Sequence, residues 1–458
     1  MDMSVKIAID TLWTCLAAIL VFFMNAGFAT VEAGFQPSKN CVNILSKNFV
    51  VFAVASVAYW FLGYGIMFGD GTPLFGTQGL FMLHGADNSP AVGEAYKGVY
   101  SSYNWAAIPL NAKFFFQLVF AGTTATIVSG AVGSRIKYLS FLLFTALITI
   151  GIYPVVGKWI WGGGWLAKMG FWDFSGSTVI HSVGGWAALT GAMILGPRFG
   201  KFGKDGSITP TPGHDLALAT IGTFILWLGW FGFNPGSTNA ADGNAIARIL
   251  MTTNSGAVAG ILAATVTSWV TMGKPDFGMT LNGCLAGLVA VTAPCAFIST
   301  ESALIIGAIA GVLVVLAVPM FERLRIDDPV GATSVHLVNG IWGTLALGLF
   351  AQDIVNPGTS GNGLFFGGGT KLLSVQATGV FAVAIFTFVV SALFWALLKI
   401  TVGIRVPLNE EIAGLDVGEH GNSAYPEYVI RKPSYSRATM VTRPSEYAGE
   451  PVNGGSRK

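Results

Sequence analysis

Apolar runs of about 20 residues recur along the chain, and short polar segments separate them. A helix of about 20 apolar residues is long enough to cross the hydrocarbon core of a bilayer. The pattern predicts such helices at residues 11–36, 48–68, 114–133, 139–157, 177–196, 214–233, 247–271, 278–297, 302–321, 333–351 and 373–400. We therefore expect an all-α polytopic membrane protein with eleven transmembrane helices.

The composition supports this expectation. Of the 458 residues, 53% are hydrophobic and only 10% are Asp, Glu, Lys or Arg, and the mean hydropathy is +0.63. Soluble domains are about 25% charged, so this chain lacks the charge to cover a soluble globule of its size. A formal net charge of +2 offers no basic surface for a nucleic acid. No catalytic, metal-binding or cofactor motif is found, and the four cysteines form no C-x-x-C pair, so neither an enzyme nor a cofactor is expected.

Basic residues gather in the loops that follow the odd-numbered helices. These residues are Lys39, Lys47, Arg135, Lys137, Arg198, Lys201, Lys204, Lys274, Arg323 and Arg325. Cytoplasmic loops carry an excess of Lys and Arg. We therefore expect a multi-pass protein of the cell membrane with its N-terminus outside and its C-terminus in the cytoplasm. Residues 1–400 are expected to form the transmembrane domain, and the polar, proline-containing residues 401–458 a cytoplasmic tail.

The sequence contains an internal repeat that includes two histidines. DFSGSTVIHSVGG, residues 173–185, aligns without gaps with DPVGATSVHLVNG, residues 328–340, at an offset of 155 residues. His181 and His336 occupy matching positions in the fifth and tenth expected helices. An odd number of spans separates the copies, so they cross the membrane in opposite directions. The pattern predicts an inverted-topology repeat, helices 1–5 against 6–10, followed by a long eleventh helix.

In such a repeat, His181 and His336 are expected to face each other inside the membrane. Intramembrane ionisable residues are costly and usually functional, and imidazole can both donate and accept a proton. We interpret the pair as part of a path for a small polar molecule or a proton; for either histidine alone, a packed core residue is an equal alternative. Asp173 precedes the fifth helix in an N-cap-like position, where a structural cap and a ligand contact are both open. Its counterpart Asp328 is expected to be structural.

Several further motifs resemble one family. They are NAGFATVEAGF at residues 25–35, WGGGWLAKMGFWDFSGSTVIH at 161–181, GWFGFNPGS at 229–237, DDPVGATSVHLVNGIWG at 327–343 and GLDVGEHG at 414–421. With these motifs the chain resembles the ammonium transporters of the Amt/Mep/Rh superfamily, in its Amt branch. The resemblance runs from the first helix to about Pro426.

The resemblance implies roles for particular residues. The external site that recruits ammonium is expected to contain Trp161 and Ser237 and to be bounded by Phe120. Two phenyl rings, Phe120 and Phe233, are expected to close the pore below that site. Phe120 is placed by counting back without gaps from the basic loop at Arg135.

Below this gate, the resemblance implies that His181 and His336 line the pore and that Asp173 lies beneath the recruitment site. Aromatic faces attract a cation by about 0.5–2 kcal/mol, whereas an apolar channel resists a bare charge by several kcal/mol. Ammonium is therefore expected to lose its proton near Asp173 and the gate. Ammonia would pass the histidines, and the proton would follow separately.

The resemblance also implies partners. The chain is expected to form a homotrimer in the lipid membrane, to accept methylammonium as an analogue of ammonium, and to be regulated through its tail at GLDVGEHG. Bacterial and archaeal relatives dock a PII-type signalling protein at the cytoplasmic face, so a protein of this type is also a candidate partner of this chain.

Two alternative functions stay open from the sequence alone. A sensor of the same fold would bind ammonium but conduct little of it. A membrane redox protein could use His181 and His336 as the axial ligands of a haem, although haem would not require Trp161 or Ser237.

Overall fold

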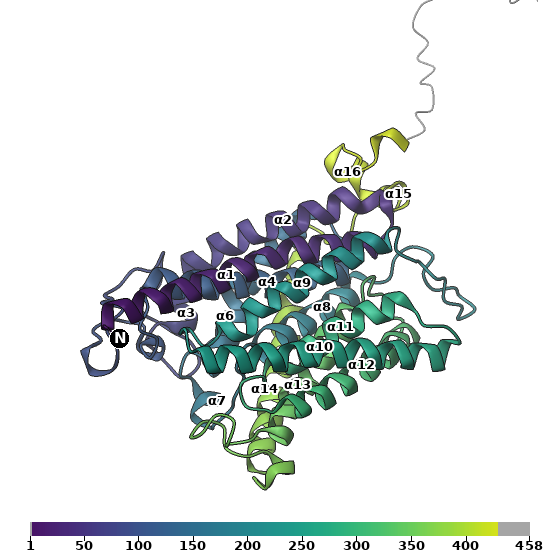
Figure 1. Cartoon of the computed structure of the whole chain (residues 1–458). Coiled ribbons are helices and arrows are strands. Elements are labelled where there is room, and N and C mark those ends of the chain that lie inside the picture. The colour runs from purple at the N-terminus through teal and green to yellow at the C-terminus, as the bar shows by residue number, and fades with distance from the viewer. Residues whose placement is uncertain (1, 429–458) are drawn as a thin grey trace, which may run out of the picture. The chain divides into compact units, whose positions relative to one another are not determined.

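The computed structural model describes residues 2–428, and within them the chain forms helices and only isolated β-bridges. Most of the long helices run side by side along one axis, with the N-terminus at one end of the bundle and α15 (Leu408–Ala413) and α16 (Leu415–His420) at the other (Figure 1). We refer to these as the N-terminal end and the far end. Residues 429–458 of the expected tail lie outside the described part.

The long helices occur where the apolar runs predicted them. They are α1 (Met3–Gly34), α2 (Cys41–Ala58), α4 (Leu110–Val132), α5 (Tyr138–Leu147), α8 (Val183–Leu195), α9 (Leu216–Gly236), α10 (Gly243–Met272), α11 (Phe277–Thr292), α12 (Thr300–Arg323), α13 (Asn339–Phe350) and α14 (Lys371–Thr401). Shorter pieces are α3 (Tyr64–Phe68), α6 (Tyr153–Ile160), α7 (Trp165–Lys168), α15 (Leu408–Ala413) and α16 (Leu415–His420).

Four of the expected spans contain π-helical turns: the first two each join two helical pieces, α2 to α3 and α5 to α6, and the last two form the beginnings of the segments that continue as α8 and α13. These turns are Tyr59–Gly63, Ile148–Ile152, Ser177–Ser182 and Thr333–Val338. Within the described residues, ten helical segments are long and apolar enough to cross a membrane. The eighth expected span corresponds to α11, which is apolar but has 16 residues.

Side-chain caps mark the starts of four of the long helices. Asp215, Asp242, Asp276 and Ser299 each accept a backbone N–H of the first turn that follows them, at the starts of α9, α10, α11 and α12. A side-chain oxygen in this position satisfies a donor that has no partner within the helix. Because Asp242, Asp276 and Ser299 lie between the apolar runs and Asp215 lies at the edge of one, the polar breaks in the sequence coincide with helix caps.

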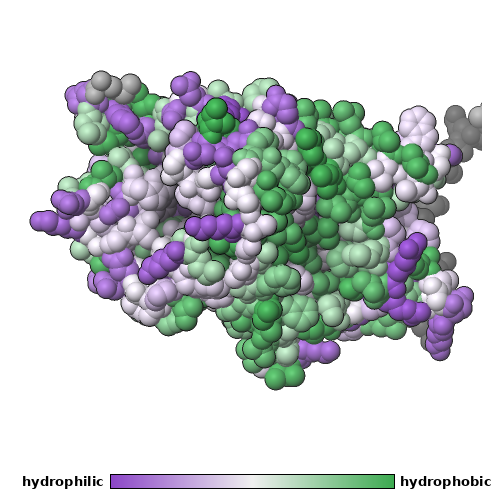
Figure 2. Space-filling model, turned by 90° about the horizontal axis from the view of Figure 1, so that it is seen from below, coloured by the Kyte–Doolittle hydropathy of each residue, from purple (hydrophilic) through white to green (hydrophobic). Residues whose placement is uncertain are grey.

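The outer surface of the bundle is apolar around its middle. Figure 2 shows a band of hydrophobic residues on one face, with hydrophilic residues gathered at both ends. Large apolar side chains such as Val270, Phe381 and Leu393 are exposed. A soluble protein rarely exposes a continuous apolar surface of this kind, whereas a lipid-facing surface requires one.

The second helix starts earlier than the hydropathy pattern predicted. The expected span began at residue 48, whereas α2 begins at Cys41 and includes Lys47, which is fully buried. Counting Lys47 as a loop residue was therefore wrong. The helix tolerates this lysine because its Nζ donates to the carbonyl of Ser129, 3.3 Å away, and lies over the Phe141 ring.

At the far end, residues 401–424 pack against the loops between helices and belong to the same compact unit as the bundle, Met1–Ala424. Arg405 pairs with Glu411, and Glu411 also accepts the backbone N–H of Phe199. Asp416 accepts the backbone N–H of Asn43 at the start of α2. The first part of the expected tail is thus held by specific contacts, and its regulatory role stays a prediction.

Candidate functional site: an aromatic vestibule above a histidine pair

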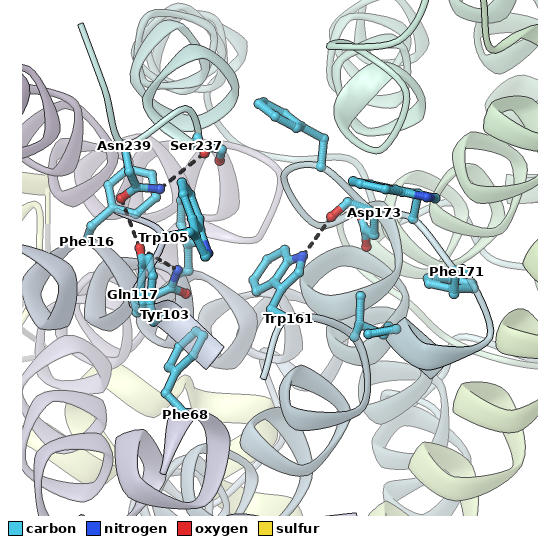
Figure 3. Close-up of a pocket in the computed structure, with 16 residues that line it drawn as sticks. Phe68, Tyr103, Trp105, Phe116, Gln117, Trp161, Phe171, Asp173, Ser237 and Asn239 are labelled. Atoms are coloured by element: carbon cyan, nitrogen blue, oxygen red, sulfur yellow. Dashed lines mark hydrogen bonds between the residues drawn. The ribbon is translucent and has the colours of Figure 1, made fainter. Parts of the chain in front are cut away.

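A cavity of about 480 Å³ opens at the N-terminal end of the bundle. Aromatic rings dominate its lining, and polar groups are few (Figure 3). The lining residues are Phe68, Tyr103, Trp105, Phe116, Gln117, Phe120, Ile160, Trp161, Ala167, Gly170, Phe171, Trp172, Asp173, Phe174, Ser237 and Asn239. Four of the residues singled out from the sequence, Phe120, Trp161, Asp173 and Ser237, therefore share this vestibule.

A hydrogen bond orients the indole of Trp161. Its indole Nε1 donates to the backbone carbonyl of Asp173 at 2.6 Å (Figure 3). The fourth expected span ended at residue 157, but α6 continues the helix to Ile160, and Trp161 is its C-cap residue. The indole is therefore attached to the end of a helix, and its ring is oriented by the segment that leads into the fifth span.

A directional chain of hydrogen bonds lines the opposite wall of the vestibule. The Asn239 side-chain amide donates to the carbonyl of Ser237 at 3.1 Å, so the Oδ1 of Asn239 is the acceptor for the Tyr103 hydroxyl at 2.9 Å. That hydroxyl in turn accepts from Gln117 Nε2 at 3.3 Å. The chain leaves Gln117 Oε1 as a buried acceptor without a partner among the described residues. A donor entering the vestibule could satisfy this oxygen.

This chain of hydrogen bonds was not predicted from the sequence. Gln117 gave a signal, because it is a polar residue inside an apolar span. Tyr103 and Asn239 lie in loops and gave none. Ser237 was expected at the recruitment site; its hydroxyl donates to the carbonyl of Phe233 at 2.9 Å, which leaves the lone pairs of its oxygen available as acceptors.

Two phenyl rings close the floor of the vestibule. The ring centroids of Phe120 (α4) and Phe233 (α9) are 4.4 Å apart, with planes tilted by 39° rather than stacked in parallel. Both side chains are buried. Phe120 also contacts Trp161, at 6.2 Å between ring centroids. The vestibule therefore continues inward only through rings in van der Waals contact.

Asp173 caps the turn that follows it. Its Oδ1 accepts the backbone N–H groups of Gly176 and Ser177, and its Oδ2 those of Thr178 and Val179, at 2.7–3.0 Å. Burial raises the pKa of this carboxyl to about 6, while the four backbone donors act in the opposite direction by favouring the ionised form. Both oxygens are thus used to fix the π-helical turn Ser177–Ser182.

His181 lies on this turn and contacts His336. The Nδ1 atoms of His181 and His336 are 3.2 Å apart, a hydrogen-bond distance, and the rings lie nearly parallel at 5.3 Å between centroids. His181 also stacks against Phe233, at 5.6 Å between centroids, and against Trp230. Since one Nδ1 must donate to the other, the two imidazoles hold different tautomers. The Nε2 atom of His181 is buried and has no partner among the described residues.

The two repeat copies have similar local structure. Asp328 accepts the backbone N–H groups of Gly331 and Thr333, as Asp173 does those of Gly176 and Thr178. A π-helical turn follows in both copies and contains the histidine.

The turns contact each other crosswise. Ser177–Ser182 packs on α13, and Thr333–Val338 packs on α8, which is the contact pattern of two segments that run in opposite directions. Gly185 and Gly340 lie at the crossing, where a Cβ would meet the backbone of the other copy.

Taken together, aromatic rings connect the vestibule to the histidine pair. Consecutive ring contacts run from Trp161 to Phe120, Phe233, His181 and His336. A cation can interact favourably with the rings at the upper end. At the lower end, the line of ring contacts reaches the two imidazoles, whose nitrogens are polar.

Comparison with protein families gives a match across this whole region. Residues 12–425 match the model of the Ammonium Transporter Family. Ammonium transporter Amt2 of Archaeoglobus fulgidus is 42% identical over 444 residues, which cover 93% of this chain and 90% of that protein. A putative ammonium transporter of Synechocystis is 39% identical over 429 residues, with 92% and 90% coverage.

Solved structures with the same fold point in the same direction. A protein described as a Sensor Amt Protein superposes with a TM-score of 0.81 at 37% sequence identity, covering 91% of this chain and 99% of its own. Mep2 of Candida albicans superposes with a TM-score of 0.80 at 26% identity, covering 96% and 95%.

Proposed function

Because the chain belongs to the ammonium transporter family, we propose that it moves ammonium across the cell membrane through the line of residues that leads from the vestibule to the histidine pair. The observation that carries the proposal is the geometry of this line: a 480 Å³ aromatic cavity, a two-ring gate and a buried imidazole pair follow one another. The relatives are named as transporters, not as enzymes. Ammonium, with methylammonium as its analogue, is the substrate in this proposal.

The vestibule recruits the cation. The faces of Trp161 and Phe120 supply attraction of about 0.5–2 kcal/mol in a partly desolvated site. Ser237 Oγ and the unpaired Gln117 Oε1 are acceptors for its N–H groups. Asp173 contributes the field of its carboxylate, and its four N–H contacts leave it poorly placed to bind the ion directly.

Past the gate, the substrate travels as ammonia. A bare cation in this apolar passage would pay several kcal/mol, whereas ammonia pays only the cost of a small polar group. His181 and His336 offer ammonia hydrogen bonds inside the passage. The proton released near the gate passes separately, through the imidazoles and water, so that transport carries charge. An ammonium-dependent current in a planar membrane or on supported proteoliposomes tests this step, and its absence from the wild type would refute charge transfer.

The bis-histidine haem alternative does not fit the distance between the imidazoles. Axial ligation places an iron atom and its macrocycle between two nitrogens. Here the Nδ1 atoms of His181 and His336 are 3.2 Å apart and hydrogen-bonded to each other, which leaves no room for an iron atom between them.

The sensor alternative is favoured by one specific observation, the likeness to a Sensor Amt Protein at 37% identity. A sensor and a transporter would share the vestibule and differ in flux. Uptake measured in proteoliposomes distinguishes them: ammonium binding without uptake would favour the sensor.

The assembly and the orientation belong to the same proposal. The chain acts as a homotrimer in the lipid membrane, with its N-terminus and vestibule outside and α15 and α16 in the cytoplasm, where the tail is regulatory and a PII-type protein is a candidate partner. The basic residues at the far end support this orientation. Cross-linking in native membranes tests the trimer, and labelling of a cysteine placed near either end tests the orientation.

The direct test of the path is methylammonium uptake in cells that lack their own transporters. Trp161→Ala, His181→Ala and His336→Ala are expected to reduce uptake severely. Matched controls are Trp60→Ala and His84→Ala, which remove an exposed tryptophan and an exposed histidine outside the path. Wild-type uptake in all three path variants would refute the site assignment.

A further inference from the structure

A small cavity lies on the other side of the histidine pair from the vestibule. It has a volume of about 20 Å³, which is room for one water-sized molecule, and His336 forms part of its wall. Its lining is mostly apolar, with Phe28 among the residues. Besides the histidine, its polar lining residues are Glu32 and Asn282. A carboxylate in this place is unexpected, because most of α1 is apolar and its other acidic residue, Asp10, lies near the N-terminal end.

The carboxylate of Glu32 is held by one of its oxygens. Oε2 accepts the Ser129 hydroxyl at 2.8 Å and the Asn48 side-chain amide at 3.0 Å. Thr126 Oγ1 donates to the Oδ1 atom of Asn48, which fixes the amide so that its nitrogen faces Glu32. Among the described residues, no hydrogen bond to Glu32 Oε1 is found. One oxygen is thus anchored, and the other is available to a molecule in the cavity.

A buried cation balances this charge without occupying the free oxygen. Lys47 Nζ donates to the carbonyl of Ser129, the same residue whose hydroxyl holds Glu32. Both charged side chains are buried. Two buried charges rarely add stability compared with apolar residues of similar size, and ionisable residues inside a membrane usually serve a function. The two buried charges are therefore costly for stability, which indicates that the carboxylate of Glu32 has a function.

We propose that this cavity is a second ammonium site, at which Glu32 Oε1 accepts an N–H of the cation that forms again below the histidine pair. The proposal deepens the proposed function and rests on it. Ammonia that has passed His336 takes a proton from the imidazole relay: an N–H bond forms on ammonia, an N–H bond of the imidazolium breaks, and neutral imidazole is recovered. The proton is the one that ammonium released at the gate, so the step needs no further reactant.

This assignment predicts an effect that depends on the side from which substrate enters. Ammonium arriving from the far end would meet Glu32 first, whereas ammonium arriving from the vestibule would meet Trp161 first. Glu32→Gln removes the charge from the acceptor, and charge-assisted hydrogen bonds contribute more than neutral ones. The KM for substrate supplied at the far side is expected to rise at least about tenfold, while the KM from the vestibule side stays within about twofold of wild type.

The experiment compares uptake of methylammonium into right-side-out and inverted membrane vesicles. The matched control is Asp10→Asn, which neutralises another buried carboxylate of α1 that pairs with Lys6 near the N-terminal end; it is expected to leave both KM values unchanged. Glu32→Asp, which keeps the charge, is expected to recover part of the far-side affinity. A purely structural role of Glu32 would lower the amount of folded protein and would not change KM from one side only.

Glu32→Gln leaves Lys47 buried and unbalanced, so the single variant could fail to fold. The double variant Glu32→Gln with Lys47→Met removes both charges and keeps the side-chain volumes similar. It is expected to show the same one-sided rise in KM. A folded variant, single or double, with wild-type KM from both sides would overturn the second site, and wild-type uptake that depends on Trp161 and His181 would leave the proposed function standing. A wild type without uptake would instead refute the proposed function.

Discussion

Replacing Asp173 with asparagine tests whether this residue acts as a cap or as a charge near the substrate. The carboxylate accepts four backbone N–H groups, two on each oxygen. Asparagine has one acceptor oxygen, and its amide nitrogen would face the other two N–H groups. A buried donor left without a partner costs about 1–3 kcal/mol, so Asp173→Asn is expected to destabilise this segment by about 2–6 kcal/mol. The turn that carries His181, and the carbonyl that holds Trp161, would both move.

Two measurements separate the interpretations. Thermal unfolding of the purified protein in detergent should show a lower unfolding temperature for Asp173→Asn, and uptake measured well below that temperature should be lost. Asp328→Asn is the matched control, because its carboxylate caps the equivalent turn in the second repeat copy but does not line the vestibule. We expect a smaller destabilisation there, since Asp328 is only partly buried, and a lower maximal rate without a change in the vestibule-side KM. An Asp173→Asn protein that unfolds at the wild-type temperature but does not transport would refute the capping argument.

Three further predictions concern contacts at the two ends of the bundle. Trp161→Phe keeps an aromatic face but loses the hydrogen bond to Asp173; the vestibule-side KM for methylammonium uptake is expected to rise about 2- to 30-fold, the equivalent of 0.5–2 kcal/mol, and an unchanged KM would contradict a cation-binding role. Gln117→Leu removes the unpaired acceptor and is expected to raise the same KM about fivefold, or about 1 kcal/mol, with the maximal rate little affected. At the far end, burial acts to raise the pKa of Asp327, but Arg198 and Arg135 hold it at about 2. A carboxyl group whose pKa is depressed in the folded state stabilises the fold above the unfolded pKa of about 4, and this contribution is lost only as the pH falls towards 2. The ion pair of Asp327 and Arg198 should therefore not change the unfolding temperature between pH 7 and 5. Asp327→Asn, in contrast, should lower the unfolding free energy by about 3–5 kcal/mol.

The sequence predicted the helices well because a membrane leaves the backbone few choices. Apolar runs of sufficient length must form helices that satisfy their own hydrogen bonds, and the expected all-α polytopic membrane fold is confirmed, whereas the count of eleven spans and the inverted repeat stay predictions. The errors lie where polar residues continue a helix: α2 starts at Cys41, and within its first turns the backbone N–H of Asn43 is accepted by Asp416 of α16, while Lys47 donates to the carbonyl of Ser129 in α4. Hydropathy alone cannot foresee such partners, since they lie on other helices.

The site, too, could be predicted from the sequence only where a residue stands out within its own helix. The repeat identified His181 and His336 because matched polar residues in apolar helices stand out in a sequence. Tyr103 and Asn239 could not be found, because loop residues lie in the vestibule only through the folded path of the loops. Glu32 was visible as a polar residue within the first span, but its significance depends on the open oxygen and the neighbouring cavity, which only the structure provides.

The repeat supports both histidines in the same way, so a difference between the two directions of transport must arise elsewhere. Each histidine lies on a π-helical turn capped by an aspartate, and neither cap favours one direction. The two ends differ: a wide aromatic vestibule adjoins one end of the pair, and a cavity for one small molecule, with a carboxylate, adjoins the other. Substitutions in a cap should therefore change the rate from both sides together, whereas substitutions in the vestibule or at Glu32 should change KM from one side each. If rate and KM changed together from both sides in all of these variants, the vestibule, the histidine pair and the cavity at Glu32 would act as a single site.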